Sequence, residues 1–368
     1  MQWRRFRGAK HVLLGNGVVQ RVLPERLAGK RVLLVTDKHL TSHIHDFRRA
    51  FPTARVFDEV VGEPDSRMVR RIQQASGGCD CIVALGGGSP LDAAKAARAC
   101  NDDGSMAEPA SIWKPLIAIP TTSGTGSEVT PFSVIANATT KEKRLLAGPT
   151  LVPTLSLVDP TLTYGKPAWL TAVTGMDALC HALEAFLSRK SNPYSDAFAV
   201  RALRRIGTHL PQCVRNPCPT SRYEMMVGST EAGLAFSSSS VTLVHGMSRP
   251  LGRFGIGHGM ANAQLVSEVV AFSQRMASDT TRFEVAKSLL FPHLDSSVSL
   301  SNALSLLAQE ELRIPTLRET LVQRGNVEEY ESRIARMGRE AMRSGSPLNN
   351  PVVPTHEQIE DLYRRAAR

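Results

Sequence analysis

Residues 81–99, CIVALGGGSPLDAAKAARA, decide the fold that we expect for the first half of the chain. The apolar run Cys81–Leu85 predicts a buried strand, the glycines after it predict a turn, and Leu91–Ala99 has the spacing of a helix. Similar runs predict further strands at Arg31–Thr36 and Leu116–Ile119 and a helix at Met68–Ala75. Strands and helices that alternate in this way predict a doubly wound α/β domain with a parallel sheet, whose ligands bind at the carboxyl ends of the strands.

The turn after the strand, formed by Gly86, Gly87, Gly88, Ser89 and Pro90, has the composition of an anion-binding loop. Ser89 suits the N-cap of the next helix, and Pro90 suits its first position. The free N–H groups and the positive dipole of a helix N-terminus favour an anion such as pyrophosphate, and adjacent glycines let that anion approach the backbone. A tight strand-to-helix turn without a ligand is the alternative interpretation.

A second loop with this character, residues 121–128 (TTSGTGSE), follows the next predicted strand. The hydroxyls of Thr121, Thr122 and Thr125 suit hydrogen bonds to phosphate or ribose. Asp37 closes the first strand, where a carboxylate can accept ribose hydroxyls and repel a 2′-phosphate, which favours NAD over NADP. The acid precedes the glycine loop instead of following it, so the usual dinucleotide fingerprint does not apply. A helix N-cap is the alternative role for Asp37.

The second half of the chain is expected to be all-helical. Turn residues in LVDPTLTYGKPAW, residues 157–169, suggest a boundary, which we predict between an NAD-binding domain at 1–162 and a helical, metal-binding catalytic domain at 163–368. Helical spacing occurs at Leu170–Leu187, Ser195–Ile206, Tyr223–Ala235, Ala263–Phe272, Ser301–Gln309 and Glu357–Ala367. Thr355 and Gln358 predict a capping box for the last helix.

Four residues of the second half suit a single divalent metal. Asp177 and His181 are four positions apart in an apolar helical stretch, so both project from one face. His245 and His258 lie in a glycine-rich segment more than 60 positions later. One carboxylate and three imidazoles suit a metal of intermediate softness and leave coordination positions open, which predicts Lewis-acid chemistry on an oxygen. A plain side-chain contact along the helix is the alternative for the Asp–His pair.

The composition excludes several other classes of protein. The chain has 368 residues, 42% of them apolar and 21% charged, which is ordinary for a globular protein of two domains. No signal peptide or run of 18 apolar residues is apparent, so we expect a cytoplasmic enzyme without a membrane partner. The formal charge is +10, but no block of five or six basic residues suggests a nucleic-acid partner. Six cysteines without CxxC pairing are expected to be reduced.

These motifs resemble the iron-containing (group III) alcohol dehydrogenases, which share a dehydroquinate synthase-like architecture. The resemblance runs nearly end to end through ALGGGSPLDAAKA, IPTTSGTGSEVTPFSVI, TGMDALCHALEAFLS, LVHGMSRPLG, HGMANA and NNPVVPTHEQIEDLY. It implies an active-site cleft between the domains, and a homodimer or higher oligomer. The implied metal ligands are Asp177, His181, His245 and His258. The implied NAD site consists of Asp37, Gly86, Gly87, Gly88, Ser89, Pro90, Thr121, Thr122, Thr130 and Lys143, to which Thr125 is added from its loop.

Arg249 departs from the family pattern. Many members have a histidine at this position, proposed to relay protons, whereas an arginine stays charged and cannot act as an ordinary base. One hypothesis is that Arg249 pairs with a carboxylate or phosphonate of the substrate. The alternative is that it caps a helix end or faces solvent. The segment between His245 and His258 is also about one residue shorter than in the better-known members.

The resulting hypothesis is an NAD-dependent alcohol dehydrogenase. It interconverts a primary or small secondary alcohol with its aldehyde or ketone, while Fe²⁺, or alternatively Zn²⁺, polarises the substrate oxygen. One alternative is a reductase of an acidic aldehyde or keto acid, similar to maleylacetate reductase. A metal-dependent lyase like dehydroquinate synthase is less favoured, because that family uses a glutamate and several lysines where this chain has Asp177 and few lysines.

Overall fold

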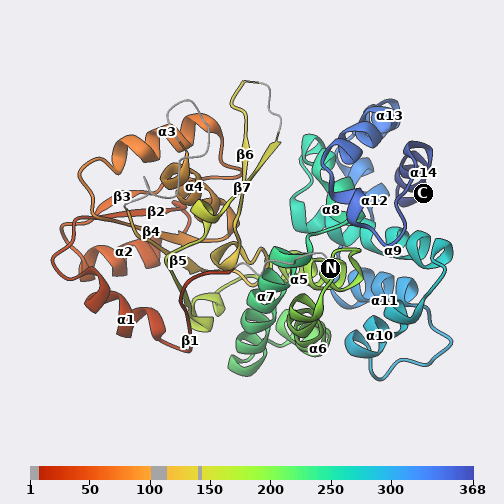
Figure 1. Ribbon diagram of the computed structural model, residues 1–368, viewed down its shortest axis with the longest axis horizontal. Helices are drawn as coiled ribbons and strands as arrows, with labels where there is room; N and C mark the ends of the chain where they lie inside the picture. Colours follow the sequence, from red (N-terminus) through yellow and green to blue (C-terminus); the bar gives the residue numbers. More distant parts are fainter. Residues whose placement is uncertain (1–7, 101–113, 140–142) are drawn as a thin grey trace. The chain divides into compact units, whose positions relative to one another are not determined.

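The computed structural model describes residues 8–100, 114–139 and 143–368 (Figure 1). The described residues divide into two compact units, 8–165 and Lys166–Arg368, which we call the N-terminal and C-terminal units. The predicted classes, a parallel sheet with helices followed by a mostly helical region, are both confirmed.

The N-terminal unit is built on a six-stranded parallel sheet in the order β1-β8-β5-β4-β2-β3. Its strands are β1 (Val12–Leu14), β2 (Val32–Thr36), β3 (Arg55–Phe57), β4 (Cys81–Gly86), β5 (Leu116–Pro120) and β8 (Leu155–Val158). The three predicted strands correspond to β2, β4 and β5, which lie side by side in the centre and are buried throughout. Strands with helices on both faces read as continuous apolar runs, which is why these three were predictable.

Helices cover both faces of this sheet. They are α1 (Val18–Leu27), α2 (Thr41–Ala50), α3 (Ser66–Ala75) and α4 (Gly88–Ala99). Successive residues of β2 enter different cores: Leu33 packs in one cluster with Ile72 of α3, whereas Leu34 packs in another with Leu23 of α1. This alternation defines a doubly wound sheet. An antiparallel hairpin of β6 (Phe132–Ala136) and β7 (Lys143–Ala147), which was not predicted, completes the unit.

Within its described residues, the C-terminal unit contains only helices and their connections. The α-helices are α5 (Ala168–Leu187), α6 (Pro193–Arg215), α7 (Pro219–Ser239), α8 (Leu243–Ser248), α9 (His258–Met276), α10 (Thr281–Leu290), α11 (Leu300–Leu306), α12 (Leu317–Gln323), α13 (Val327–Arg343) and α14 (His356–Ala366). The capping box predicted at Thr355 and Gln358 begins α14 as expected.

Helix α5 is the central helix of this unit and packs against α6, α7 and α9. Its length and apolar composition would also suit a membrane span, but 83% of its most apolar stretch of 18 residues is buried inside the unit. A helix that is largely apolar and buried in this way is typical of the core of a large domain. The polar residues that α5 carries into this core form part of the candidate site.

Candidate active site

One face of α5 carries three buried ionisable side chains. Asp177, His181 and Glu184 are 3%, 5% and 3% exposed. Their spacing of four and then three residues places them above one another on the helix. Buried charges are costly unless they are paired, so this face requires partners from elsewhere in the unit.

Helices α8 and α9 supply those partners. His245 lies in α8, and His258 is the first residue of α9. The Asp177 Oδ1 atom lies 3.9 Å from His181 Nε2, 3.6 Å from His245 Nε2 and 3.7 Å from His258 Nε2. The three imidazoles therefore gather around the Asp177 carboxylate, with Asp177, His245 and His258 forming the tightest set of donors. The side chain of His258 is 36% exposed, against 5–7% for the other three, so the centre opens on the His258 side.

The donor geometry fits a divalent cation. Donors held about 2.1 Å from an ion in a tetrahedral arrangement lie about 3.4 Å from one another. The measured separations between the Asp177 oxygen and the three imidazole nitrogens, 3.6–3.9 Å, are slightly wider. The suitable donor atoms of Asp177, His245 and His258 also lie within 4.8 Å of one another. A small inward movement of the side chains would complete such a site.

Glu184 fixes the orientation of His245. One carboxylate oxygen accepts hydrogen bonds from the Thr242 hydroxyl at 2.6 Å and the Val244 N–H at 2.7 Å. The other oxygen contacts His245 Nδ1. When Nδ1–H donates to Glu184, the lone pair of Nε2 points to the centre, which is the tautomer that a metal requires.

The charges of the cluster shift its pKa values. Burial alone lowers the pKa of His245, but the charge of Glu184 and the hydrogen bonds to Asp177 and Glu184 outweigh burial and raise it to about 9. Burial likewise opposes ionisation of Asp177, yet the neighbouring histidines hold the pKa of this carboxyl well below its usual range. The carboxylate is therefore anionic and ready to bind a cation.

Asn262 also faces the centre. Its Nδ2 donates to Asp177 Oδ1 at 2.7 Å and lies 3.2 Å and 3.4 Å from the Nε2 atoms of His245 and His258. Its Oδ1 is buried without a hydrogen-bond partner among the described residues. The amide nitrogen thus contacts three of the four proposed ligands and holds Asp177 in place, and it would have to turn away when an ion binds between them.

Glycine allows α9 to approach α5 closely. A Cβ atom at Gly259 would lie 2.3 Å from the Val173 carbonyl oxygen of α5, closer than real Cβ atoms come to any atom. The two helix backbones therefore touch at this point. Because His258 precedes Gly259 directly, this contact sets how far the imidazole reaches toward Asp177.

Arg249 lies one helical turn beyond His245. Ser248 and Arg249 both have right-handed helical dihedral angles, so the backbone continues from α8 into the 3-10 helix Arg249–Phe254 without a break. Residues four apart on such a backbone share a face. The side chain is half-buried, burial lowers its pKa, and the charge of Glu184 acts on it in the opposite sense.

The two predicted loops of the N-terminal unit lie against each other. A Cβ atom at Gly87 would lie 3.4 Å from Thr122 Oγ1, and one at Gly88 would lie 2.8 Å from the Thr125 side chain. The Thr121 N–H donates to the Gly86 carbonyl at 2.9 Å. Two neighbouring strand ends, β4 and β5, therefore present one continuous surface of backbone and hydroxyl groups.

Comparison with known proteins identifies the family. Residues 9–160 match the iron-containing alcohol dehydrogenases, and residues 171–367 match the C-terminal region of the same family. The chain belongs to the iron-containing alcohol dehydrogenase family. The predicted family and its alcohol oxidoreductase activity are thereby confirmed.

Individual relatives cover nearly the whole chain. The chain is 33% identical to 1,3-propanediol dehydrogenase of Klebsiella pneumoniae, with 92% of each protein covered. It is 31% identical to NAD-dependent methanol dehydrogenase of Bacillus methanolicus, with 96% of this chain and 97% of that protein covered. Among solved structures, 1,3-propanediol oxidoreductase superposes with a TM-score of 0.87 at 31% identity, covering 99% of this chain and 100% of the other. Sulfoacetaldehyde reductase of Bifidobacterium kashiwanohense, solved with NAD⁺, superposes with a TM-score of 0.86 at 27% identity, covering 100% of this chain and 99% of the other.

Two details of the glycine loop in this alcohol dehydrogenase differ from the prediction. Helix α4 begins at Gly88 with Gly87 as its N-cap, so Ser89 is not the cap and Pro90 is not the first helical residue. The strand runs into the helix with almost no connection, and Gly86, at φ 153°, makes the sharp turn. The first free N–H groups of the helix therefore include those of Gly87 and Gly88, which suits close approach by an anion better than the predicted start.

Thr130 and the second loop are held by a buried lysine. Lys95 of α4 is fully buried, and its ammonium group donates to the Ser127 carbonyl at 2.8 Å, the Ser127 hydroxyl at 3.0 Å and the Thr130 hydroxyl at 3.2 Å. Burial lowers the pKa of Lys95 to about 8, although the charges of Asp92 and Glu128 oppose this shift. Lys95 therefore ties the loop to the helix that begins at the glycines.

Two other predicted cofactor residues make contacts of their own. Asp37 follows β2 directly, and its carboxylate accepts a hydrogen bond from the His39 N–H at 2.9 Å. It does not cap α2, whose N-cap residue is Leu40. Lys143, at the start of β7, forms an ion pair with Glu63 at 2.5 Å.

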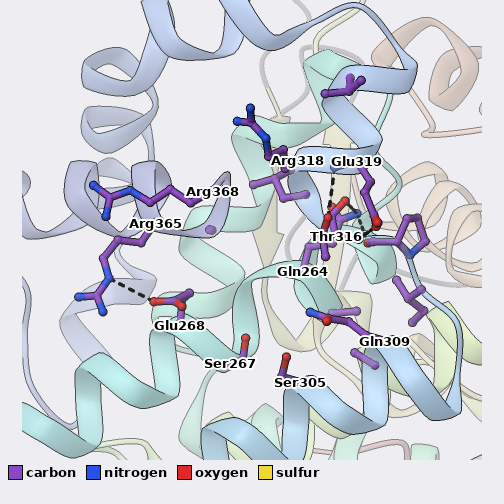
Figure 2. A pocket seen from close by; sticks show the side chains of 17 residues that line it. Gln264, Ser267, Glu268, Ser305, Gln309, Thr316, Arg318, Glu319, Arg365 and Arg368 are labelled. Atoms are coloured by element: carbon purple, nitrogen blue, oxygen red, sulfur yellow. Dashed lines mark hydrogen bonds and ion pairs between the residues drawn. The ribbon is translucent and has the colours of Figure 1, made fainter.

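A pocket of about 520 Å³ lies in the C-terminal unit but does not include the four-residue centre. Figure 2 shows its polar lining, to which α9 contributes Gln264, Ser267 and Glu268. Asn262, two residues earlier on α9, faces Asp177 instead. The pocket and the centre therefore lie on different sides of the same helix.

Sequence reasoning missed Glu184 and Asn262. Both occur at helical spacing from a predicted ligand, since Glu184 is three residues after His181 and Asn262 is four after His258. A search for polar residues three or four positions from each predicted ligand, on the same helical face, would have found both. It would not have shown which partner each residue binds.

Proposed function

We propose that this protein is an NAD-dependent dehydrogenase of small alcohols whose divalent metal is held by Asp177, His181, His245 and His258. The observation that carries the proposal is the convergence of one carboxylate and three imidazoles from α5, α8 and α9 on one buried centre. The names of the relatives support an alcohol or aldehyde as substrate and NAD as cofactor. Fe²⁺ is the first candidate because of the family, and Zn²⁺ suits the same donors.

The side chains around the centre prepare it for that chemistry. When bound, a divalent ion acts as a Lewis acid that lowers the pKa of an alcohol, and NAD accepts the hydride. Asp177 supplies the negative charge that retains a cation, and Glu184 keeps His245 in the tautomer with a free Nε2. Burial of Asp177, His181 and His245 excludes water from all but one side. The more exposed His258 leaves that side open to the substrate.

The cofactor residues are proposed by the same reasoning. The N-terminal N–H groups of α4, at Gly87, Gly88 and Ser89, suit a pyrophosphate, while Gly86 and Pro90 shape the turn. The half-buried Thr122 and Thr125 of the adjacent loop extend the proposed surface. Thr121 and Thr130 are buried and Lys143 is paired with Glu63, so these three proposed contacts would require local movement. Asp37 at the end of β2 suits the hydroxyls of the adenosine ribose.

Reconstitution tests the metal proposal directly. Metal-depleted protein is loaded with Fe²⁺ or Zn²⁺, bound metal is measured by elemental analysis, and NADH formation is followed with C2–C6 alcohols and diols. We expect His258→Ala to lose metal and activity together, whereas the control His356→Ala, at the exposed start of α14, retains both. Full activity after extensive chelation, or in His258→Ala without metal, would rule out the metal role.

A homodimer or higher oligomer and a cytoplasmic location remain predictions. Strand β1 supports self-association, because among the described strands it has a neighbour, β8, on one side only. Its three residues Val12, Leu13 and Leu14 are 36–41% exposed, and an apolar edge strand is a surface on which a second chain can pair. Sedimentation equilibrium of the wild type and of Leu13→Lys would test this, since a monomeric wild type contradicts it.

A further inference from the structure

The position and environment of Arg249 lead to an inference about the substrate. Arg249 follows His245 by four residues on an unbroken right-handed helical backbone. Side chains at this spacing have Cβ atoms about 5–6 Å apart and point from the same face. The guanidinium therefore extends from the face of the helix that carries a proposed metal ligand.

The guanidinium has no partner among the residues that the structure describes. Within residues 8–100, 114–139 and 143–368, no hydrogen bond or ion pair engages it, although the side chain is half-buried. The carboxylate of Glu184, whose charge acts on Arg249, is already occupied by Thr242, Val244 and His245. A guanidinium stays ionised, so its burial without a counter-ion is unfavourable unless a ligand supplies one.

Helix capping does not explain this placement. The carbonyl of Met247, near the end of α8, accepts from the Tyr363 hydroxyl at 2.7 Å, and the carbonyl of His245 accepts from Ser248 at 3.2 Å. Within the described part of the chain, Arg249 donates to no helix carbonyl. The next arginine along the segment, Arg253, is different because it pairs with Glu340 at 3.5 Å.

The charges around the centre favour an anion. The carboxylates of Asp177 and Glu184 carry two negative charges, which one divalent ion would balance, so among these groups Arg249 adds a positive charge without a counter-charge. A neutral alcohol would not compensate this charge, whereas a substrate with one anionic group would. A planar guanidinium binds carboxylate, sulfonate or phosphonate oxygens in pairs, which also fixes the orientation of the substrate.

We propose that Arg249 binds an anionic group of the substrate, so that the preferred substrate pair is a short aldehyde or ketone bearing a carboxylate, sulfonate or phosphonate and its corresponding alcohol. This inference rests on the proposed function, because the carbonyl must lie at the four-residue centre. The spacing of about 5–6 Å between the two side-chain origins suits a chain of a few carbons between carbonyl and anion. In the reducing direction NADH gives a hydride to the carbonyl carbon and a proton is added to the oxygen, while the anionic group is unchanged.

Matched substrates test the proposal in the metal-reconstituted enzyme. Sulfoacetaldehyde, phosphonoacetaldehyde and succinate semialdehyde are compared with propanal and butanal in wild type, Arg249→Ala, Arg249→Lys and the control Arg253→Ala. We expect wild type to prefer at least one anionic aldehyde in kcat/KM. Arg249→Ala should lower the ratio of anionic to neutral kcat/KM by about 10- to 100-fold, the range for hydrogen bonds to charged groups. Arg249→Lys should retain part of this preference, and Arg253→Ala all of it.

A binding measurement separates this inference from the proposed function. Calorimetric titration with unreactive ethanesulfonate and methylphosphonate, using protein without metal, should give binding that Arg249→Ala abolishes and Arg253→Ala retains. If no aldehyde is reduced but this binding is observed, the proposed function fails and the anion site stands. Equal preference of wild type for both substrate series, an unchanged ratio in Arg249→Ala, or absence of Arg249-dependent binding would each overturn the inference. Circular dichroism confirms that each variant is folded.

Discussion

Replacement of Glu184 by glutamine tests whether this buried carboxylate prepares the metal centre. Glutamine has nearly the same shape, so packing in α5 is retained, but one carboxylate oxygen becomes an NH₂ group. All three groups that contact the carboxylate, the Thr242 hydroxyl, the Val244 N–H and His245 Nδ1, are positioned to donate to it. The substitution therefore cannot satisfy every donor, whichever way the amide is oriented.

Each orientation of the amide has a definite cost. With the NH₂ group toward His245, the imidazole must move its proton from Nδ1 to Nε2, and the lone pair that would bind the metal is lost. With the NH₂ group toward Val244, a backbone N–H at the start of α8 loses its acceptor. A buried donor left without a partner costs about 1–3 kcal/mol. We therefore expect the metal affinity to fall about 10- to 100-fold, the usual effect of removing such a supporting contact.

Competition with a chelator of known affinity measures this loss for Zn²⁺, and for Fe²⁺ under anaerobic conditions. Glu231→Gln is the matched control, since Glu231 is a buried carboxylate of α7 in the same unit. It pairs with Arg201 and Arg205 instead of with a proposed ligand. Its loss should lower stability without changing metal affinity. Equal affinity in Glu184→Gln and wild type, or equal weakening in both variants, would refute the role of Glu184.

Three further predictions test the helix contact, the buried lysine and the cofactor loop. Gly259→Ala would place a Cβ atom 2.3 Å from the Val173 carbonyl oxygen and force α9 away from α5. We expect a lower Tm and, by elemental analysis, loss of bound metal. Gly257→Ala is the control, because a Cβ atom there would have nothing within 4 Å, and it should change neither quantity. Burial lowers the pKa of Lys95 from 10.5 to about 8, so the unfolded chain binds this proton more tightly than the folded chain does. As the pH rises from about 8 to 10.5, the free energy of unfolding should therefore increase, by at most about 3 kcal/mol. Urea titrations at several pH values should show this increase in the wild type and not in Lys95→Met. Asp37→Ser should raise the ratio of kcat/KM with NADP to that with NAD at least about tenfold, because it removes a carboxylate that would repel a 2′-phosphate, and an unchanged ratio would contradict a ribose contact.

The sequence predicted the parts of the fold that have a clear apolar pattern. Strands β2, β4 and β5 are buried on both faces, so each forms an uninterrupted apolar run. Strand β1 has three residues, all exposed, and β3 has three, of which only one is buried. Runs this short carry no detectable period, and their role depends on the neighbouring strands that pair with them.

The start of α4 shows a different limit of sequence reasoning. Cap preferences favoured Ser89, but the helix begins at the glycines because the strand ends directly before them. Gly86 can adopt its φ of 153° at little cost, and Pro90 packs where a Cβ of that glycine would lie, 2.7 Å from its ring. Tertiary packing therefore decided a boundary that local preferences placed two residues too late.

For the candidate site, the types of residue were predictable but their connections were not. Asp177, His181, His245 and His258 stand out because carboxylates and imidazoles are metal donors. Glu184 and Asn262 do not, because glutamate and asparagine on helices are common. Their importance arises from the crossing of α5, α8 and α9, which brings residues about 60 to 85 positions apart into hydrogen-bond contact. No local pattern encodes that crossing.

Under the proposed function, the polar face of α5 is explained by binding and not by stability. This helix is apolar enough to resemble a membrane span, yet it buries Asp177, His181 and Glu184 in the core of its unit. Replacing buried charged groups by apolar residues of similar size is often neutral or stabilising. The mutual contacts of these side chains with His245 and Asn262 reduce the cost of burial, and the proposed metal role supplies a reason for placing them together. Because Glu184 holds His245 and Asn262 holds Asp177 before any ion binds, only small side-chain movements would be needed to bind one, and this preparation would account for charges that folding alone would not select.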